Sequence, residues 1–265
     1  MRPLILITND DGVLSPGIKA AAEAVYSLGD LLIVAPRYEQ SAMGRSYPKG
    51  DDNGIIEEME LELNGKKQKA YGVHGSPAQA VSHGILELAS RTPDLCISGV
   101  NYGENIGLNL IPSGTLGAAF EANTYDIPAI AVSQEVNLEI HHSREYQLKD
   151  WKPAKYFTLL FARKVLESGL PKEIGALNVN LPASANEHTK IKRTTQSRQN
   201  YFKIKKPNKR AFSKPYEFSV DLIINESTLE RTSDIKAIVF DKVVSVTPLG
   251  WDLTANTEWG KEYDF

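Results

Sequence analysis

Residues 4–12 read LILITNDDG, an apolar run that passes directly into two adjacent carboxylates. Four consecutive apolar residues that end in a turn are typical of a strand buried on both faces of a parallel sheet. In open α/β sheets, the carboxyl ends of the strands border the ligand-binding crevice. The stretch therefore predicts a first strand that delivers Asp10 and Asp11 to that edge.

The two adjacent carboxylates admit two interpretations. Neighbouring carboxylates repel each other unless a cation or a proton lies between them, and hard divalent cations prefer carboxylate oxygens. A metal site that uses Asp10 and Asp11 is the first interpretation. The second is a polar turn, because Asn, Asp and Gly are common in turns. The stretch alone does not separate them.

Length, charge and cysteine content narrow the class of protein. The chain has 265 residues, a net charge of −3 and one cysteine, Cys96, which lies in an apolar run. These values allow one large domain or a domain with an appendage, exclude an internal disulfide framework, and give no overall attraction to nucleic acid or membrane. No apolar stretch approaches the ~18 residues that span a bilayer. We expect a soluble, cytoplasmic protein with a buried Cys96.

Strand and helix patterns alternate through the first half of the chain. Helices are expected to begin at Ser15, Ser76 and Ser113, because Ser is a preferred N-cap. Pro follows Ser15 and Ser76, and Pro is favoured at the first position of a helix. Apolar strands are expected at 31–35, 95–97 and 129–132, and a hairpin that turns at 64–65. This alternation predicts an α/β fold, a Rossmann-like and mostly parallel sheet sandwiched by helices.

The second half differs in character. A long helix is expected at 151–166 and a strand at 176–181, followed by alternating patterns at 217–224 and two short strands within 236–246. We expect residues 1–135 to form the catalytic core. Residues 136–265 would add a helix that completes this core, a β-hairpin extension and a C-terminal segment that serves oligomerisation.

Residues 188–216 contain no acidic side chain and ten Lys or Arg. Such a stretch can neutralise phosphates of a nucleic acid, with Tyr201 and Phe202 stacking on bases. It can equally be a solvated hairpin whose charges prevent edge-to-edge aggregation, or a guide for a small anion. The acidic chain as a whole favours the hairpin, so we expect no stable nucleic-acid binding.

Three further loops are candidates to complete a site with the carboxylates. The first contains Ser41, whose hydroxyl suits a metal or a phosphate, and the second contains Asn101, whose carbonyl oxygen suits a hard cation. The third, at 113–119, turns into a helix whose N-terminus can bind an anion, although N-capping by Ser113 or Thr115 also explains it. Together the loops indicate metal-assisted hydrolysis of a phosphate monoester.

The same motifs, in this order and spacing, resemble the SurE survival-protein family of metal-dependent 5′/3′-nucleotidases, which are acid phosphatases. The motifs that carry the resemblance are residues 9–12, 15–17, 35–41, 98–101 with Gly103 and Asn105, 113–115, 246–249 and 252–254. The segment at 138–235 matches weakly. One position and one segment depart from the family pattern: Ala42 replaces a usual Gly, and 76–79 read SPAQ instead of Thr-Pro-x-Asp.

The resemblance implies specific roles. Catalysis would depend on Asp10 and Asp11, which with Ser41 and Asn101 would bind one Mg²⁺ or Mn²⁺ per subunit. The phosphate would be held by another group of residues: Asn9, Asn105, Ser113, Gly114 and Thr115. The family implies release of inorganic phosphate from nucleoside 5′- and 3′-monophosphates by metal-activated water, in homodimers or homotetramers. Asp10 as a base or as a covalent nucleophile stays an alternative to water.

Two other functional classes are alternatives. A phosphoaspartate receiver or a related phosphatase also has an acidic pair after its first strand, but a receiver needs an Asp after strand three, where this chain has Ser98-Gly99. A non-catalytic nucleotide or nucleic-acid binder would use the basic stretch. Metal-dependent release of phosphate from AMP distinguishes the enzyme from the binder.

Overall fold

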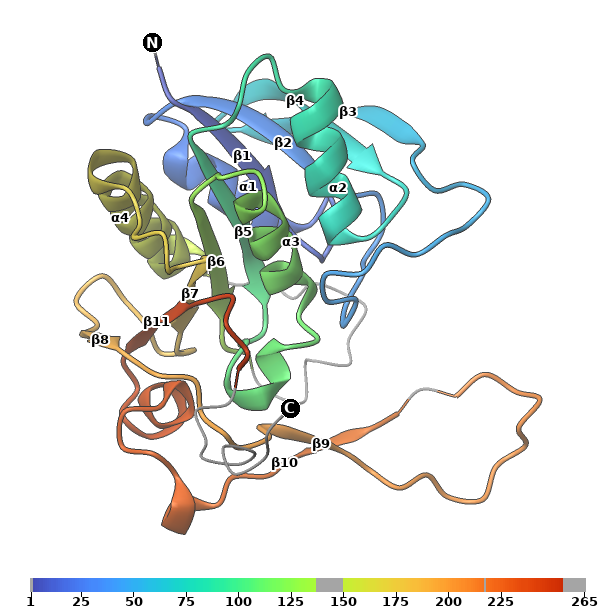
Figure 1. Cartoon of the computed structure of the whole chain (residues 1–265), viewed down its shortest axis with the longest axis vertical. Coiled ribbons are helices and arrows are strands. Elements are labelled where there is room, and N and C mark those ends of the chain that lie inside the picture. The colour runs from blue at the N-terminus through green and yellow to red at the C-terminus, as the bar shows by residue number, and fades with distance from the viewer. Residues whose placement is uncertain (1, 137–149, 217, 255–265) are drawn as a thin grey trace, which may run out of the picture.

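The computed structural model describes residues 2–136, 150–216 and 218–254, and its centre is a nine-stranded sheet (Figure 1). The strand order is β3-β4-β2-β1-β5-β6-β7-β11-β8. In chain order the strands are β1 (Leu4–Thr8), β2 (Asp30–Pro36), β3 (Ile56–Leu63), β4 (Lys66–Val73), β5 (Leu95–Tyr102), β6 (Ala129–Gln134), β7 (Ala176–Leu181), β8 (Ile191–Arg193) and β11 (Val244–Leu249). Neighbours from β4 to β7 pair in parallel, which confirms the predicted fold class.

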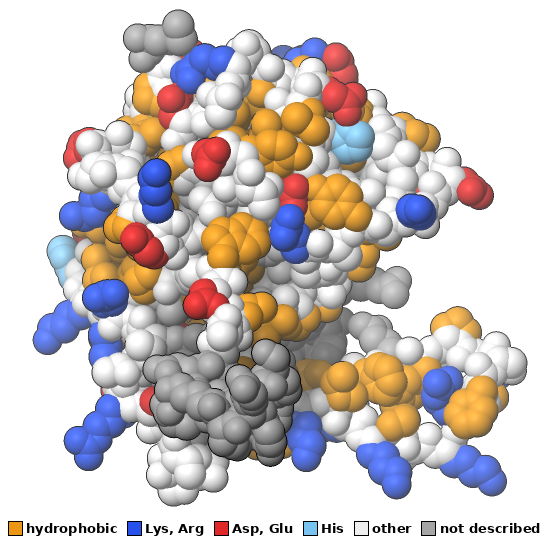
Figure 2. Space-filling view, viewed as in Figure 1, with side chains coloured by type: hydrophobic (Ala, Val, Ile, Leu, Met, Phe, Trp, Pro, Cys, Tyr) orange, Lys and Arg blue, Asp and Glu red, His pale blue; other side chains and the backbone are white. Residues whose placement is uncertain are grey.

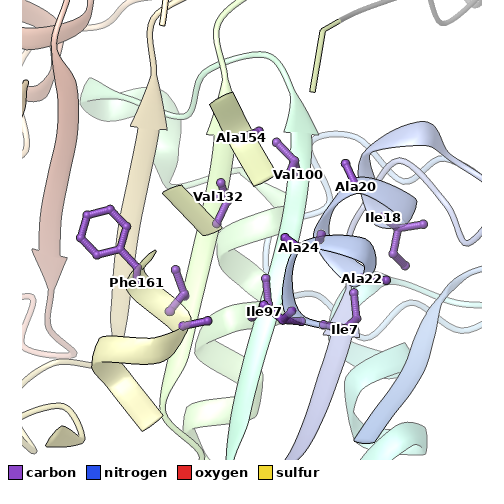
Figure 3. Close-up of a cluster of buried hydrophobic side chains, with 14 of the residues drawn as sticks. Ile7, Ile18, Ala20, Ala22, Ala24, Ile97, Val100, Val132, Ala154 and Phe161 are labelled. Carbon is purple, nitrogen blue, oxygen red and sulfur yellow. The ribbon is translucent and has the colours of Figure 1, made fainter. Parts of the chain in front are cut away.

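Helices cover both faces of this sheet (Figure 1). One face carries α1 (Pro16–Val25) and α4 (Lys152–Ser168), and the other carries α2 (Pro77–His83) with its continuation η1 (Gly84–Leu88), and α3 (Gly114–Asn123). Because side chains alternate along a strand, Ile5 and Ile7 pack with α1 and α4 while Leu4 and Leu6 pack on the opposite face. Figure 3 shows part of the first of these clusters, which includes Ile7 of β1 and Ile18 of α1. A strand buried on both faces explains the uninterrupted apolar run.

The expected helix starts are confirmed at all three serines. The hydroxyl of Ser15 accepts from the backbone N–H of Ile18, and that of Ser113 accepts from Leu116. Ser76 forms a complete capping box, in which its hydroxyl accepts from the N–H of Gln79 and the Gln79 side chain accepts from the N–H of Ser76. The sequence SPAQ at 76–79 thus keeps the capping function with Gln in the last position.

The expected hairpin joins β3 to β4 as an antiparallel pair. Its turn residues, Asn64 and Gly65, have φ angles of 50° and 75°, and positive φ at both positions is what a two-residue hairpin turn of the type I′ class requires. The pair lies at one edge of the sheet, where β4 continues the parallel order beside β2.

The second half completes the sheet and adds an arm. β7 and β11 pair antiparallel within the main sheet, whereas β9 (Phe202–Ile204) and β10 (Val220–Leu222) form a separate antiparallel pair that extends away from the body (Figure 1). We refer to residues 202–222 as the arm. Short turns lie at η2 (Gly107–Leu110), η3 (Glu226–Thr228) and η4 (Lys236–Phe240).

The prediction of two strands within 236–246 is half wrong. Residues of η4 form one wide helical turn, closed by the N–H of Asp241 donating to the carbonyl of Lys236, and only β11 is a strand. Ala237 and Ile238 are both buried. In a strand with one exposed face, these successive residues would face opposite sides and only one of them would be buried. Short apolar runs do not distinguish a buried turn of helix from a strand.

Candidate active site

The candidate residues come from four segments that meet at the carboxyl edge of the parallel strands (Figure 1). These are the turn after β1, the loop after β2, the end of β5 with the loop that follows it, and the N-terminus of α3. β1 lies between β2 and β5, so its carboxyl end is at the centre of this edge.

Asp10 is the most enclosed of the candidate carboxylates, with 5 % of its surface exposed. Its Oδ1 accepts a 2.7 Å hydrogen bond from the hydroxyl of Thr115, and its backbone carbonyl accepts a 2.7 Å hydrogen bond from the N–H of Gln40. Burial raises the pKa of Asp10 to about 6, against the opposing effect of the Thr115 hydrogen bond. The negative charge of Glu39 adds a smaller contribution in the same direction. A cation at this carboxylate would favour its charged form.

Gly114 allows the N-terminus of α3 to approach Asp10. A Cβ atom at this position would lie 2.8 Å from Cβ of Asp10 and 2.9 Å from its Oδ2. It would also lie 3.1 Å from the carbonyl oxygen of Gln40. Only glycine permits this contact, so the first backbone groups of α3 stand directly against the carboxylate.

Asp11 and Asn101 lie at the neighbouring strand end. The backbone N–H of Tyr102, the last residue of β5, donates to Oδ2 of Asp11 over 3.2 Å. The side-chain amide of Asn101 donates to the carbonyl of Gly103 over 2.8 Å. This hydrogen bond fixes the orientation of the Asn101 amide. The side-chain carbonyl oxygen of Asn101, which is an acceptor, is then the atom suited to a cation.

Ser41 is exposed, and its hydroxyl donates a 2.8 Å hydrogen bond to Oε1 of Glu39. It follows Gln40, whose N–H donates to the backbone carbonyl of Asp10 and whose carbonyl lies against Gly114, so the loop that carries Ser41 begins at the turn after β1. Ala42 has a φ of 59°, a left-handed conformation that favours glycine. The departure at this position therefore puts alanine in a conformation that glycine adopts at lower cost.

Asn9 lies beneath the turn and holds it together. Its amide nitrogen donates to the carbonyl of Gly12 over 3.2 Å and to the hydroxyl of Ser15 over 2.6 Å. Its Oδ1 is buried, and none of the described residues donates a hydrogen bond to it. Asn9 was expected to hold phosphate, but its amide N–H groups are directed into the turn and toward the N-cap of α1.

Asn105 is linked to Thr115 by its side-chain amide, which donates to Thr115 Oγ1 over 3.3 Å and to Ser133 Oγ over 3.0 Å. Two asparagines of β7 hold its backbone: Asn180 Oδ1 accepts from its N–H, and the amides of Asn178 and Asn180 donate to its carbonyl. Ser133, Asn178 and Asn180 were not among the site residues predicted from the sequence. The available signal was polar residues inside otherwise apolar, fully buried strands.

Glu104, also absent from the candidates, connects this loop to the base of the arm. It is 5 % exposed, its carboxylate accepts from the hydroxyl of Tyr201, and burial raises its pKa. Asn109 strengthens the connection, because its Oδ1 accepts from the N–H groups of Tyr201 and Phe202. The candidate site and the arm are thus held to each other by buried polar contacts.

The oxygen donors fit a hard divalent cation. Within residues 2–136, 150–216 and 218–254, no three His, Cys, Asp or Glu side chains gather as a metal cluster. The candidate set differs from such a cluster because it combines only two carboxylates with the Ser41 hydroxyl and the Asn101 carbonyl oxygen. Carboxylate, hydroxyl and carbonyl oxygens suit Mg²⁺ or Mn²⁺ rather than zinc. The buried Asp10 carboxylate beside Asp11 supplies the negative charge that such an ion needs.

Comparison with known proteins identifies the family. The sequence profile described as "Survival protein SurE" matches residues 5–203. The chain belongs to the SurE family. It is 37 % identical, over 98 % of this chain and 97 % of the relative, to the "5'-nucleotidase SurE" of Methanothrix thermoacetophila. It is 41 % identical, over 95 % and 93 %, to the protein of the same name from Methanocella arvoryzae.

The solved SurE protein from Aquifex aeolicus has the same fold as this SurE chain. The two align with a TM-score of 0.74 and 30 % sequence identity, over 95 % of each chain. The resemblance drawn from the sequence motifs is therefore confirmed. In the part of the SurE chain that the structure describes, no helix is both long and apolar enough to cross a membrane.

Proposed function

We propose that this SurE-family chain is a metal-dependent 5′-nucleotidase that hydrolyses nucleoside 5′- and 3′-monophosphates to nucleoside and inorganic phosphate. The observation that carries the proposal is the direct contact between the N-terminus of α3 and Asp10, through the Thr115 hydroxyl and the close approach at Gly114. A carboxylate suited to a cation and a helix end suited to an anion then share one edge of the sheet. Hydrolysis of a phosphate monoester needs both a site for the metal ion and a site for the phosphate.

We assign Asp10, Asp11, Ser41 and Asn101 as the residues that would hold one Mg²⁺ or Mn²⁺ per subunit. When bound, such an ion lowers the pKa of a coordinated water and polarises a phosphoryl oxygen. Thr115 keeps the Asp10 carboxylate oriented through its 2.7 Å hydrogen bond. Asp10 would then orient the attacking water, with Asp11 contributing the second negative charge.

The phosphate would be held by α3. The start of a helix carries the positive end of its dipole, which favours an anion, and Ser113 and Gly114 stand at this start. Asn105, fixed by β7 and hydrogen-bonded to Thr115, would donate to a phosphate oxygen from the side. Asn9 would contribute by holding the turn that carries both aspartates.

The test is release of phosphate from AMP in the presence of Mn²⁺, with and without a chelator, for the wild-type chain and Asp10→Asn. We expect turnover that the chelator abolishes, and a loss of at least ~10²-fold in the variant, as expected when a ligand of the metal is lost. Binding of AMP without metal-dependent turnover would support a non-catalytic nucleotide binder instead. A panel of 3′-monophosphates, short polyphosphate and an aryl phosphate would define the range of substrates.

We also propose that residues 136–265 serve a homodimer or homotetramer through the arm, while residues 1–135 form the catalytic core. The arm exposes large apolar side chains, among them Phe212 at 89 %, Ile204 at 60 % and Phe218 at 50 %. Figure 2 shows hydrophobic and basic side chains gathered on the arm as it extends from the body. Exposed apolar patches of this kind usually mark contact surfaces. Light scattering coupled to gel filtration, with and without residues 205–219, measures the state.

A cytoplasmic location completes the proposal. It is supported by the single cysteine, Cys96, which is fully buried in β5 and whose pKa burial raises to about 12. A lone thiol of this kind neither needs an oxidising compartment nor reacts readily.

A further inference from the structure

The loop that carries Ser41 is attached to the site at its beginning. The N–H of Gln40 donates to the carbonyl of Asp10 over 2.7 Å, and the carbonyl of Gln40 lies against Gly114. The residue before Ser41 is thus enclosed between the turn after β1 and the start of α3.

The same loop is attached again three residues after Ser41. The N–H of Gly44 donates to the carbonyl of Pro112 over 2.8 Å, just before α3 begins. A Cβ atom on Gly117 would lie 2.1 Å from the carbonyl oxygen of Gly44, so the backbones of the loop and of α3 are in direct contact. Only Ser41, Ala42 and Met43 span the interval, with Ala42 held in a left-handed conformation.

Glu121, the residue of α3 about one turn beyond Gly117, binds the end of this loop. Its side chain is 4 % exposed, and its Oε2 accepts from Nε of Arg45 over 2.6 Å. Its Oε1 accepts from the hydroxyl of Tyr47 over 2.6 Å and from Ser82 of α2 over 3.0 Å. A buried carboxylate is tolerated only when donors compensate for its lost hydration, and here two of the three donors come from the loop.

We propose that Glu121 is a positioning residue for the metal site, and that it acts by holding the 41–47 loop so that the Ser41 hydroxyl can reach an ion bound at Asp10. This inference rests on the proposed function, because it takes Ser41 as a ligand of the ion. The left-handed Ala42 shows why an attachment is needed: the conformation between the two anchor points is not one that its sequence prefers. Glu121 is not among the residues proposed to hold the ion or the phosphate, and its hydrogen bonds go to Arg45, Tyr47 and Ser82, so its effect would pass through the loop.

The test measures binding of Mn²⁺ to the full chain by electron paramagnetic resonance, which reports on free Mn²⁺ without requiring turnover. Glu121→Gln keeps the size of the side chain and removes its charge. We expect Mn²⁺ affinity to fall about tenfold, the size of effect seen when residues that orient metal ligands are replaced. Thermal unfolding of the same samples establishes that the variant is folded at the temperature of the titration.

A double-mutant cycle separates positioning from general destabilisation. Ser41→Ala should weaken Mn²⁺ binding, and Glu121→Gln added to it should cause no further loss, because the hydroxyl that it positions is gone. The matched control is Glu23→Gln, which removes a mostly buried carboxylate paired with Lys155 on the other face of the sheet. It should bind Mn²⁺ as the wild type does. Tyr47→Phe removes one donor from the loop and should give a smaller loss even if Glu121→Gln fails to fold.

Wild-type Mn²⁺ affinity in Glu121→Gln or in a folded Tyr47→Phe would overturn this inference alone. So would a loss in Glu121→Gln that adds in full to that of Ser41→Ala. Absence of Mn²⁺ binding by the wild-type chain would overturn the proposed function and the inference with it.

Discussion

The hydroxyl of Thr115 donates a 2.7 Å hydrogen bond to Oδ1 of Asp10 across 105 residues of sequence. Both residues are buried, and the contact joins the turn after β1 to the N-terminus of α3. Asn105 extends it, since its amide donates to the same hydroxyl oxygen. This short chain of hydrogen bonds holds Asp10, the proposed metal ligand, in a fixed orientation relative to the residues proposed to hold phosphate.

Thr115→Val removes this alignment while keeping the shape of the side chain. We expect kcat for AMP to fall about 10- to 100-fold, as for other partners that orient metal ligands. The matched control is Thr158→Val on α4, which removes a buried hydroxyl that has no hydrogen-bond partner among the described residues. The control should keep full activity. Steady-state kinetics at saturating Mn²⁺ measure both, and equal rates for the two variants would contradict the role of Thr115.

Gly114→Ala should disable the site although alanine is the better helix former. The new methyl group would lie 2.8 Å from Cβ of Asp10, so the carboxylate or the start of α3 must move. We expect a loss of at least ~10-fold in kcat, from misplaced reacting groups, and a loss of about 1–3 kcal/mol in unfolding free energy, from overpacking. Phosphate-release kinetics and urea denaturation measure these effects. A variant as active as the wild type would show that the close approach is not needed.

Ala42→Gly should stabilise the chain. The left-handed φ of 59° costs alanine energy that glycine does not lose, so we expect a gain of about 1 kcal/mol in unfolding free energy. Ala24→Gly, the same substitution inside α1, should instead cost about 1 kcal/mol. Urea denaturation of the two variants decides the matter. Destabilisation by both would mean that the loop conformation is not strained.

His74 should titrate above its ordinary pKa. Its Nε2 lies 2.7 Å from Oε1 of Glu57, and its Nδ1 lies 3.0 Å from Oδ2 of Asp52. Both carboxylates raise the pKa of the ring, with Glu57 having the larger effect. The stabilisation from this group is therefore complete below the ordinary histidine value near 6.5 and is lost as pH rises through the raised pKa.

NMR titration of the ring protons of His74 measures this value directly. Glu57→Gln should bring the pKa of His74 back toward its ordinary range, while Glu62→Gln, further along the same exposed strand, should leave it unchanged. An unaltered His74 pKa in Glu57→Gln would contradict the pairing.

The sequence predicted those parts of the fold that local pattern determines. The apolar run at 4–7, the serine N-caps and the Asn64-Gly65 turn each carry their signal within a few residues, and each is present in the structure. The short run at 236–240 was misread because apolar residues at that length fit a helical turn and a strand equally well.

Contacts between residues far apart in the chain could not be predicted from the sequence. Nothing near Glu121 in the chain indicates that its carboxylate accepts hydrogen bonds from Arg45 and Tyr47, which lie over seventy residues earlier. Asn178 and Asn180 became interpretable only when β7 was placed beside β6 and the loop after β5. Polar residues within a buried strand signal that a partner exists, but only the fold identifies it.

The most direct measurement is the anomalous scattering of crystals soaked in Mn²⁺. We expect one manganese peak per chain between the carboxylates of Asp10 and Asp11, within ligand distance of the Ser41 hydroxyl and the Asn101 carbonyl oxygen. A map with no peak at these carboxylates, or with the ion held by other residues, would contradict it.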